Sequence, residues 1–97
     1  MTVQTRDLRR ARRKRVLIRA TLISTDGPQT VRVKDLTSEG AGIRCDVPLT
    51  VGTDVILERS DLFVAARVVW AEGANAGLEF YRPLTFGDES FMLGETE

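Results

Sequence analysis

The sequence contains no histidine and a single cysteine, Cys45. Without histidine there is no Ser-His-Asp or Cys-His arrangement for nucleophilic catalysis, and no imidazole ligand for a metal ion. One cysteine forms neither an intrachain disulfide nor a thiolate zinc site. These absences exclude the commonest kinds of catalytic centre. We therefore predict that the protein recognises a ligand, is not an enzyme, and needs no metal or cofactor.

Long apolar runs are also missing. The longest run, residues 62–66, has five residues, whereas a membrane-spanning helix needs about 18. Near the N-terminus, Arg19 interrupts the apolar stretch of residues 16–23, which is unlike the continuous apolar region of a signal peptide. We therefore expect no membrane insertion and a location in the reducing cytoplasm.

The net charge is also zero, but only when it is summed over the whole chain. The chain has 97 residues, with 14 basic and 14 acidic side chains. Residues 1–19 carry eight basic side chains against one acid, Asp7, and residues 85–97 carry four acids and no base. A chain of this length suits one domain. We predict a flexible basic arm over residues 1–14, a folded domain over residues 15–82, and an acidic tail or short helix over residues 83–97.

What the sequence does contain is six short segments in which apolar and polar residues alternate, the pattern of half-buried β-strands. The segments are residues 15–24, 30–36, 41–47, 53–58, 62–71 and 76–81. Turn-forming residues separate them, and no stretch with helical periodicity lies between them. The pattern predicts a mainly all-β fold, a small antiparallel barrel or sandwich.

The alternation also assigns two unusual side chains to the interior. Cys45 is in phase with Ile43 and Val47, and Trp70 is in phase with Val68. We therefore expect Cys45 to be a small buried residue. For Trp70 the same argument favours packing in the core over stacking on a nucleic-acid base.

Arginine dominates the predicted arm. Its planar guanidinium can donate two hydrogen bonds to a phosphate or to the O6 and N7 atoms of guanine, and it can stack on a base. The spacing Arg-x-x-x-Arg occurs as Arg6 with Arg10, Arg9 with Arg13, and Arg15 with Arg19. The middle pair directly precedes the first strand. The arm therefore suits an anionic ligand, and a generic solvated tail is the alternative.

A second polar cluster, Asp-Leu-Thr-Ser-Glu-Gly at residues 35–40, falls between two predicted strands. The Asp35 carboxylate could accept hydrogen bonds from the N1–H and N2–H₂ groups of a guanine, and Thr37 could donate one to a phosphate. Gly40 would let a flat ligand approach the backbone. The same residue types also stabilise ordinary turns, so this cluster alone leaves both interpretations open.

The two clusters together resemble the motifs of the PilZ domain family. These are Arg-x-x-x-Arg before the first strand and [Asp/Asn]-x-[Ser/Thr]-x-x-Gly between the second and third. Further matches are Gly-Ala-Gly-Ile at 40–43, Val-Val-Trp at 68–70 and Gly-Leu-Glu-Phe at 77–80, so the resemblance extends over roughly residues 6–82. It implies a bacterial six-stranded antiparallel β-barrel that binds the second messenger cyclic di-GMP.

The resemblance also implies roles for single residues. Arg9 and Arg13 match the two motif arginines that clasp the guanines and phosphates, with Arg10 beside them. Asp35 matches the residue that contacts a guanine. At position 37 a Thr stands where the family usually has Ser, which keeps the hydroxyl and adds a methyl group, and residue 40 is the closing glycine of the motif.

The resulting hypothesis is a stand-alone cyclic di-GMP receptor, either a monomer or a ligand-linked dimer. Bound ligand would order the arm against loop 35–40 and present a new surface to a downstream protein. One alternative is a degenerate PilZ-like adaptor that does not bind the ligand. Another is a basic-tailed barrel that binds RNA or DNA. The last expects exposed aromatic side chains for base stacking, whereas most of the six aromatic residues fall in phase with core positions.

Overall fold

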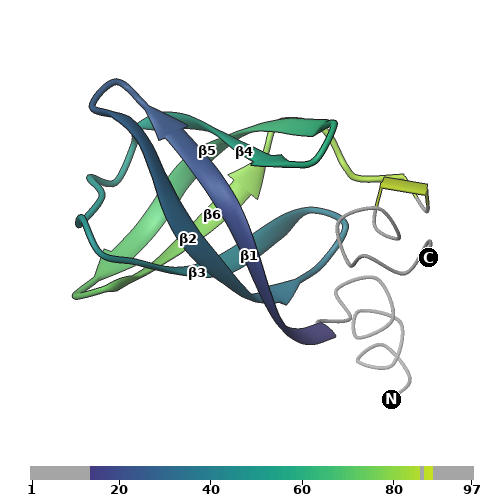
Figure 1. The fold of residues 1–97 in the computed structure, drawn as a ribbon, viewed down its shortest axis with the longest axis horizontal. Helices are drawn as coiled ribbons and strands as arrows, with labels where there is room; N and C mark the ends of the chain where they lie inside the picture. Colours follow the sequence, from purple (N-terminus) through teal and green to yellow (C-terminus); the bar gives the residue numbers. More distant parts are fainter. Residues whose placement is uncertain (1–13, 86, 89–97) are drawn as a thin grey trace, which may run out of the picture.

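The described residues form a closed barrel of six antiparallel strands (Figure 1). The computed structural model describes residues 14–85 and 87–88, without the side chains of residues 14 and 15. The strands are β1 (Lys14–Ser24), β2 (Gly27–Leu36), β3 (Gly40–Cys45), β4 (Asp54–Arg59), β5 (Leu62–Glu72) and β6 (Asn75–Phe80). Around the barrel they follow the order β1-β2-β3-β6-β5-β4, and β4 closes the circle by pairing with β1. The predicted six-stranded antiparallel barrel is confirmed, while the division into arm, domain and tail stays a prediction.

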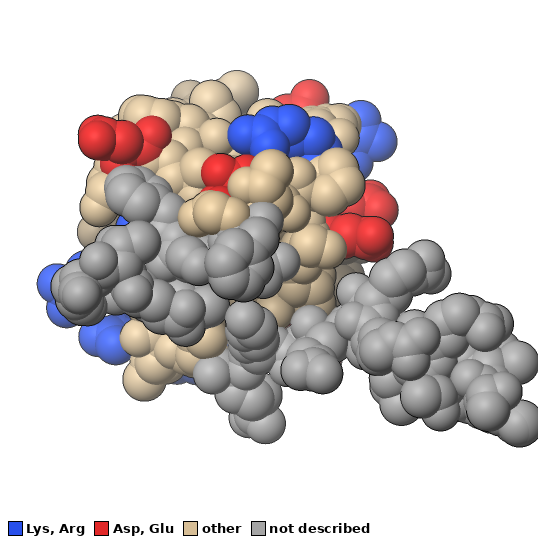
Figure 2. Space-filling view, turned by 90° about the vertical axis from the view of Figure 1, so that its right-hand side faces the viewer, with Lys and Arg blue, Asp and Glu red and all other residues tan. Residues whose placement is uncertain are grey.

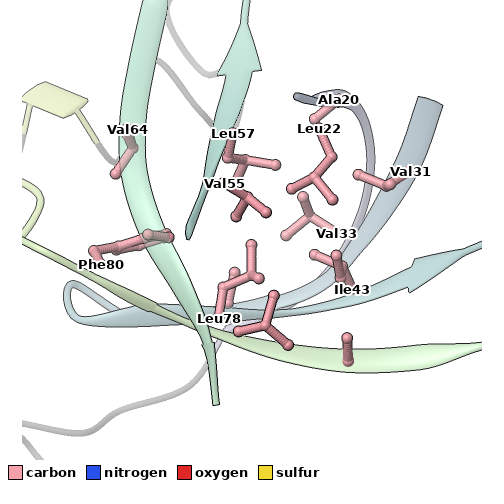
Figure 3. Packing of buried hydrophobic residues seen from close by; sticks show 14 of the residues in the cluster. Ala20, Leu22, Val31, Val33, Ile43, Val55, Leu57, Val64, Leu78 and Phe80 are labelled. Atoms are coloured by element: carbon pink, nitrogen blue, oxygen red, sulfur yellow. The ribbon is translucent and has the colours of Figure 1, made fainter. Parts of the chain in front are cut away.

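Alternate residues of the strands point into the barrel and fill it (Figure 3). Val33, Ile43, Leu57 and Val64 each have an exposed fraction of at most 1%. Burying one such side chain stabilises the fold by about 1.5–3 kcal/mol. Among the described residues no polar or charged side chain is buried. A polar ligand must therefore bind on the outer wall or at an end of the barrel.

The end of β3 matches the prediction for Cys45 but not for Val47. Cys45 is buried as expected, and its burial, with the nearby Asp46 carboxylate, raises the pKa of its thiol. Val47, expected in the same interior row, is half exposed. The side-chain amide of Gln29 exchanges hydrogen bonds of 3.2 and 3.3 Å with the Val47 backbone, which holds this residue outside the barrel. The prediction for Val47 is therefore wrong.

β2 begins earlier than predicted, at Gly27 rather than at Thr30. Gly27, with a φ of 104°, closes the tight turn from β1. Pro28 then lies opposite Ile23 as part of the strand. At this point β2 borders β1 alone, because its pairing with β3 begins only at Val31. Such an edge tolerates a residue that lacks an N–H group.

Within the described residues, β-bulges interrupt the ladder between Arg15 and Ile18, between Val33 and Asp35, and between Val68 and Trp70. The last of these adds Val69 to β5 and reverses the phase of the strand. Ala71 then packs against the core, and Trp70 lies on the outer wall with 46% of its surface exposed. Simple alternation does not anticipate an added residue. The prediction that Trp70 packs in the core is therefore wrong.

Beyond β6 the chain crosses the end of the barrel. The N–H of Leu84 donates to the carbonyl of Ser38 at 2.7 Å, and the Leu84 side chain is buried. Thr85 and Asp88 exchange hydrogen bonds of 3.0 and 3.1 Å in the pattern of a capping box, which begins a helix. The bond from the Thr85 N–H lowers the pKa of the Asp88 carboxyl. The predicted C-terminal helix otherwise lies outside the described residues.

Three arginines lie side by side on the outer wall of β1, β2 and β3. Arg19 is opposite Arg32, and Arg32 is opposite Arg44. All three are exposed, and they are termed the arginine row below. Cross-strand pairs of like charge destabilise a sheet by about 0.2–1 kcal/mol each. The row therefore lowers the stability of the barrel.

Arg32→Glu places an acid between Arg19 and Arg44. Because two repulsive pairs become attractive, the free energy of unfolding is expected to rise by about 0.5–1 kcal/mol. The rise is measured as the thermal midpoint by circular dichroism at low ionic strength. It should shrink in about 1 M salt, where charges are screened beyond about 3 Å.

Arg67→Glu is the matched control, with the same change of charge on the same outer wall. Arg67 lies opposite Asp54, with its Nε 3.7 Å from that carboxylate, and its Nε also donates to the hydroxyl of Tyr81 at 3.1 Å. This variant should therefore lower the thermal midpoint. An equal fall in the Arg32→Glu variant would contradict the repulsion within the arginine row.

Candidate functional site

A row of four residues across the outer wall has an acid at one end and an indole at the other. Asp35 of β2 lies opposite Gly42 of β3. Gly42 lies opposite Gly77 of β6, which in turn lies opposite Trp70 of β5. Neighbouring strands are about 4.8 Å apart, so the row is roughly 14 Å long. It lines a hollow of about 320 Å³, termed the binding hollow below.

The two glycines make room for the acid and the indole. A Cβ atom on Gly77 would overlap the Trp70 indole at Nε1, and one on Gly42 would lie 2.8 Å from Oδ2 of Asp35. Both glycines are buried, because these two side chains cover the glycine floor of the binding hollow. A flat ring that enters the hollow therefore meets the exposed part of the Trp70 ring and the Asp35 carboxylate.

A β-bulge lies beside each end of this row. The bulge between Val33 and Asp35 and the bulge between Val68 and Trp70 bring the acid and the indole onto the same outer face. Bulges commonly re-aim side chains next to binding sites. Asp35 is half-buried, and its Oδ1 accepts a hydrogen bond of 3.1 Å from the N–H of Gly42. This bond holds the carboxylate at the edge of the binding hollow.

The predicted loop of residues 35–40 is the β2–β3 turn, and Thr37 organises it. The Thr37 hydroxyl accepts hydrogen bonds from the N–H groups of Glu39 and Gly40, both at 3.0 Å, and the Thr37 N–H donates to the Gly40 carbonyl at 2.9 Å. This is the turn-stabilising role that the sequence left open. Thr37 also lines the binding hollow, and its contact with a ligand stays a prediction.

Gly40 lines the binding hollow too, but packing alone explains why a glycine stands there. It lies opposite Glu79 of β6, and a Cβ atom at this position would overlap the carbonyl oxygen of Leu78. Any larger residue would therefore push β3 away from β6. The expected approach of a flat ligand to the Gly40 backbone stays a prediction.

The predicted arm residues lie outside the described residues: Arg9, Arg10 and Arg13. The described start of β1 nevertheless fixes where the arm is attached. Arg15 lies opposite Asp35, so the chain enters the barrel beside the β2–β3 turn (Figure 1). The predicted arm would therefore join the barrel at the edge of the binding hollow.

The binding hollow itself is acidic. Its lining includes the carboxylates of Asp35, Glu39 and Glu79, and none of the described residues that line it is Lys or Arg. Figure 2 looks onto the end of the barrel where β1 begins and shows both acidic and basic side chains there, in places next to each other. The hollow therefore suits the N–H groups of a heterocyclic ring. A phosphate bound there needs basic groups from outside the hollow.

Reasoning from the sequence did not assign Gly42, Gly77 or Trp70 to the site. A usable signal existed for the glycines, because glycine weakens a strand and often marks a close approach of another group. For Trp70 the alternation predicted packing in the core, because the bulge before it depends on the pairing of β5 with β6 and is not visible in the local pattern.

Two further features are absent from the described part of the chain. There, no group of three or more His, Cys, Asp or Glu side chains is placed to hold a metal ion. Nor does any helix among these residues have the length and apolar character needed to cross a membrane.

Comparison with known proteins agrees with the motifs. A family model for the PilZ domain matches residues 7–93. Among solved structures, the chain is similar to the crystal structure of the PilZ domain of CeSA from a cellulose-synthesising bacterium. The TM-score is 0.64 and the sequence identity 18%, over 88% of this chain and 98% of that one, a likeness that shows the fold alone. No curated protein matches the chain. The resemblance inferred from the motifs is confirmed.

Gly77→Ala tests whether the Trp70 indole packs directly on the Gly77 backbone. The added methyl group must displace the indole of Trp70, the only tryptophan of the chain. We expect its fluorescence emission to shift to longer wavelength as the ring becomes more exposed, and the barrel to stay folded by circular dichroism at a loss of about 1–3 kcal/mol.

Gly52→Ala serves as the control for this loss of stability. Gly52 has a φ of 93° and open space around a Cβ atom, so alanine there strains the backbone without touching the indole. Its emission spectrum should match that of the unmodified protein. An unchanged spectrum in the Gly77→Ala variant would show that the indole does not lie on the floor.

Proposed function

Because the chain belongs to the PilZ domain family, a family of cyclic di-GMP receptors, we propose that it binds this second messenger in the binding hollow with help from the basic arm. One observation carries the proposal. Arg15 lies opposite Asp35, so an arginine-rich arm is attached at the edge of a hollow that offers an acid and an indole.

The binding hollow suits a guanine base. The N1–H and N2–H₂ groups of guanine lie on one edge, and a carboxylate such as that of Asp35 can accept hydrogen bonds from both. The exposed face of Trp70 offers a stacking platform, which contributes about 1–3 kcal/mol per base. Because Gly42 and Gly77 carry no Cβ atom, the acid and the indole can lie close against the wall, which leaves space above them for a base.

The phosphates of the ligand require the arm. The binding hollow is lined by carboxylates, and a doubly anionic ligand would be repelled without added positive charge. Arg9 and Arg13 supply this charge in the proposed complex, and Arg10 assists them. A guanidinium can donate two parallel hydrogen bonds to one phosphate. Thr37 and Gly40 are proposed to contact the ligand from the β2–β3 turn while they maintain its shape.

The proposed output is a protein contact rather than a reaction. Ligand that joins the arm to the binding hollow would fold residues 1–13 onto the barrel and create a surface for a downstream protein in the bacterial cytoplasm. The receptor acts without catalysis, as a monomer or as a dimer linked by ligand. Two alternatives remain: an adaptor that does not bind cyclic di-GMP, and a basic-tailed barrel that binds RNA or DNA. The titration described next distinguishes them from the receptor.

Isothermal titration calorimetry with cyclic di-GMP is expected to show saturable binding with a dissociation constant of about 1–10 µM, near 7–8 kcal/mol of binding free energy. Asp35→Ala, Arg13→Ala and Trp70→Ala should each weaken binding about tenfold, because each removes one contact of about 1–3 kcal/mol. Asp61→Ala and Arg67→Ala delete the same charges at residues that do not line the binding hollow and should bind like the unmodified protein.

The outcomes separate the three functions. The unmodified protein is titrated with cyclic di-GMP at tens of micromolar, above the expected dissociation constant of about 1–10 µM. If no heat is measured, the receptor is rejected and the adaptor is favoured. Equal weakening by Arg67→Ala and Arg13→Ala would indicate a generic effect of charge. Tight binding of mixed-sequence RNA that the Trp70→Ala substitution abolishes would favour the nucleic-acid barrel.

The register of the arm motif can be read from matched single variants. We expect Arg9→Ala and Arg13→Ala to weaken cyclic di-GMP binding about tenfold, and Arg6→Ala at most about twofold, as for an exposed charge. The measurement is the same titration. A larger loss for Arg6→Ala than for Arg9→Ala would assign the motif to Arg6 and Arg10 instead.

A further inference from the structure

The arginine row is a feature that the proposed ligand site does not use. Arg19, Arg32 and Arg44 occupy directly opposite positions on β1, β2 and β3. The ion pairs of the described residues join Arg67 to Asp54 and Arg82 to Asp88, and none involves the row. The row therefore holds concentrated positive charge that no described carboxylate neutralises.

The flanks of the row add donors. Beside Arg19, the Nη1 of Arg59 donates to the Arg19 carbonyl at 2.9 Å. The Nε of Arg59 is buried and has no hydrogen-bond partner among the described residues. Both arginines line a hollow of about 350 Å³ together with Thr21 and Thr30, and Glu58 is the acid of this lining. A buried donor without a partner is unfavourable, and a bound acceptor would recover part of that cost.

We propose that the arginine row binds an extended acidic segment of a partner protein, with one carboxylate seated between Arg19 and Arg59 and others along Arg32 and Arg44. This inference is independent of the binding of cyclic di-GMP, because it rests on a different part of the outer wall. It assigns the barrel itself, rather than the arm, a surface for another chain.

The geometry favours an acidic peptide. In an extended peptide, side chains on one side repeat at about 6.6–6.8 Å. The Cα atoms of the row are about 4.8 Å apart, and long arginine side chains on the convex wall of a barrel can spread apart to match this wider repeat. The planar guanidinium also matches a carboxylate through two hydrogen bonds. The spacing and the chemistry of the row therefore both fit alternating Asp or Glu side chains.

Single-stranded nucleic acid fits this surface less well. Such ligands need aromatic platforms for their bases in addition to positive charge. The outward neighbours of the row on β1 and β2 include Leu17, Thr21 and Thr30, none of which is aromatic. The exposed indole of Trp70 lies on β5, beyond both β3 and β6 in the strand order. The row therefore offers charge without a stacking surface.

Fluorescence anisotropy of a labelled decapeptide of alternating Glu and Thr tests the proposal on the full chain, at low ionic strength and again at about 0.15 M salt. The triple variant Arg19→Gln, Arg32→Gln, Arg44→Gln should bind the peptide at least about tenfold more weakly, since each exposed pair contributes a factor of about two to five. The matched control is Arg6→Gln, Arg10→Gln, Arg12→Gln, which has the same net charge. It should change the affinity by about twofold or less.

Two outcomes would overturn the proposal. One is an equal loss in both triple variants, since the effect would then follow net charge alone. The other is tighter binding of a labelled oligothymidylate than of the peptide, with the loss again confined to the row, which would make the row a nucleic-acid surface. If the row variant unfolds, Arg32→Glu replaces it. That single substitution should weaken peptide binding about tenfold, and unchanged binding would reject the proposal.

Discussion

The filled interior of the barrel is the constraint on which the rest of the structure depends. Side chains such as Val33, Ile43 and Leu57 are fully buried and fill the interior, because a barrel this narrow is just wide enough for its own side chains. A polar ligand is therefore confined to the outer wall and the ends of the barrel. The wall is shaped in two ways: bulges and glycines form the binding hollow, whereas an undisturbed ladder between Arg19, Arg32 and Arg44 aligns like charges.

Much of the fold could be predicted because the alternation of apolar and polar residues is a local property. It located all the described strands and the burial of Cys45. It was wrong at Trp70 and Val47, and both errors have a non-local cause. The bulge before Trp70 arises from the pairing of β5 with β6. Val47 is held outside by Gln29, eighteen positions earlier in the sequence.

The motif residues of the candidate site could be predicted from the sequence, whereas the glycines of its floor could not. Asp35, Thr37 and Gly40 all line the binding hollow, because a short polar loop keeps its members together whatever the register. Gly42 and Gly77 come from strands far apart in the sequence, and only the pairing of β3 with β6 brings them side by side. The double use of Thr37, as the centre of a turn and as part of the lining, is likewise visible only in three dimensions.

The burial of Cys45 has a practical consequence. A thiol with an exposed fraction of 2% and a raised pKa is mostly protonated at neutral pH and shielded from electrophiles. Maleimide reagents should therefore react little with the native cysteine. A cysteine introduced at a chosen position of the predicted arm could then be modified selectively in the otherwise unaltered chain. An acceptor dye attached there would report its distance from Trp70 by energy transfer, so the proposed folding of the arm onto the barrel could be tested in real time.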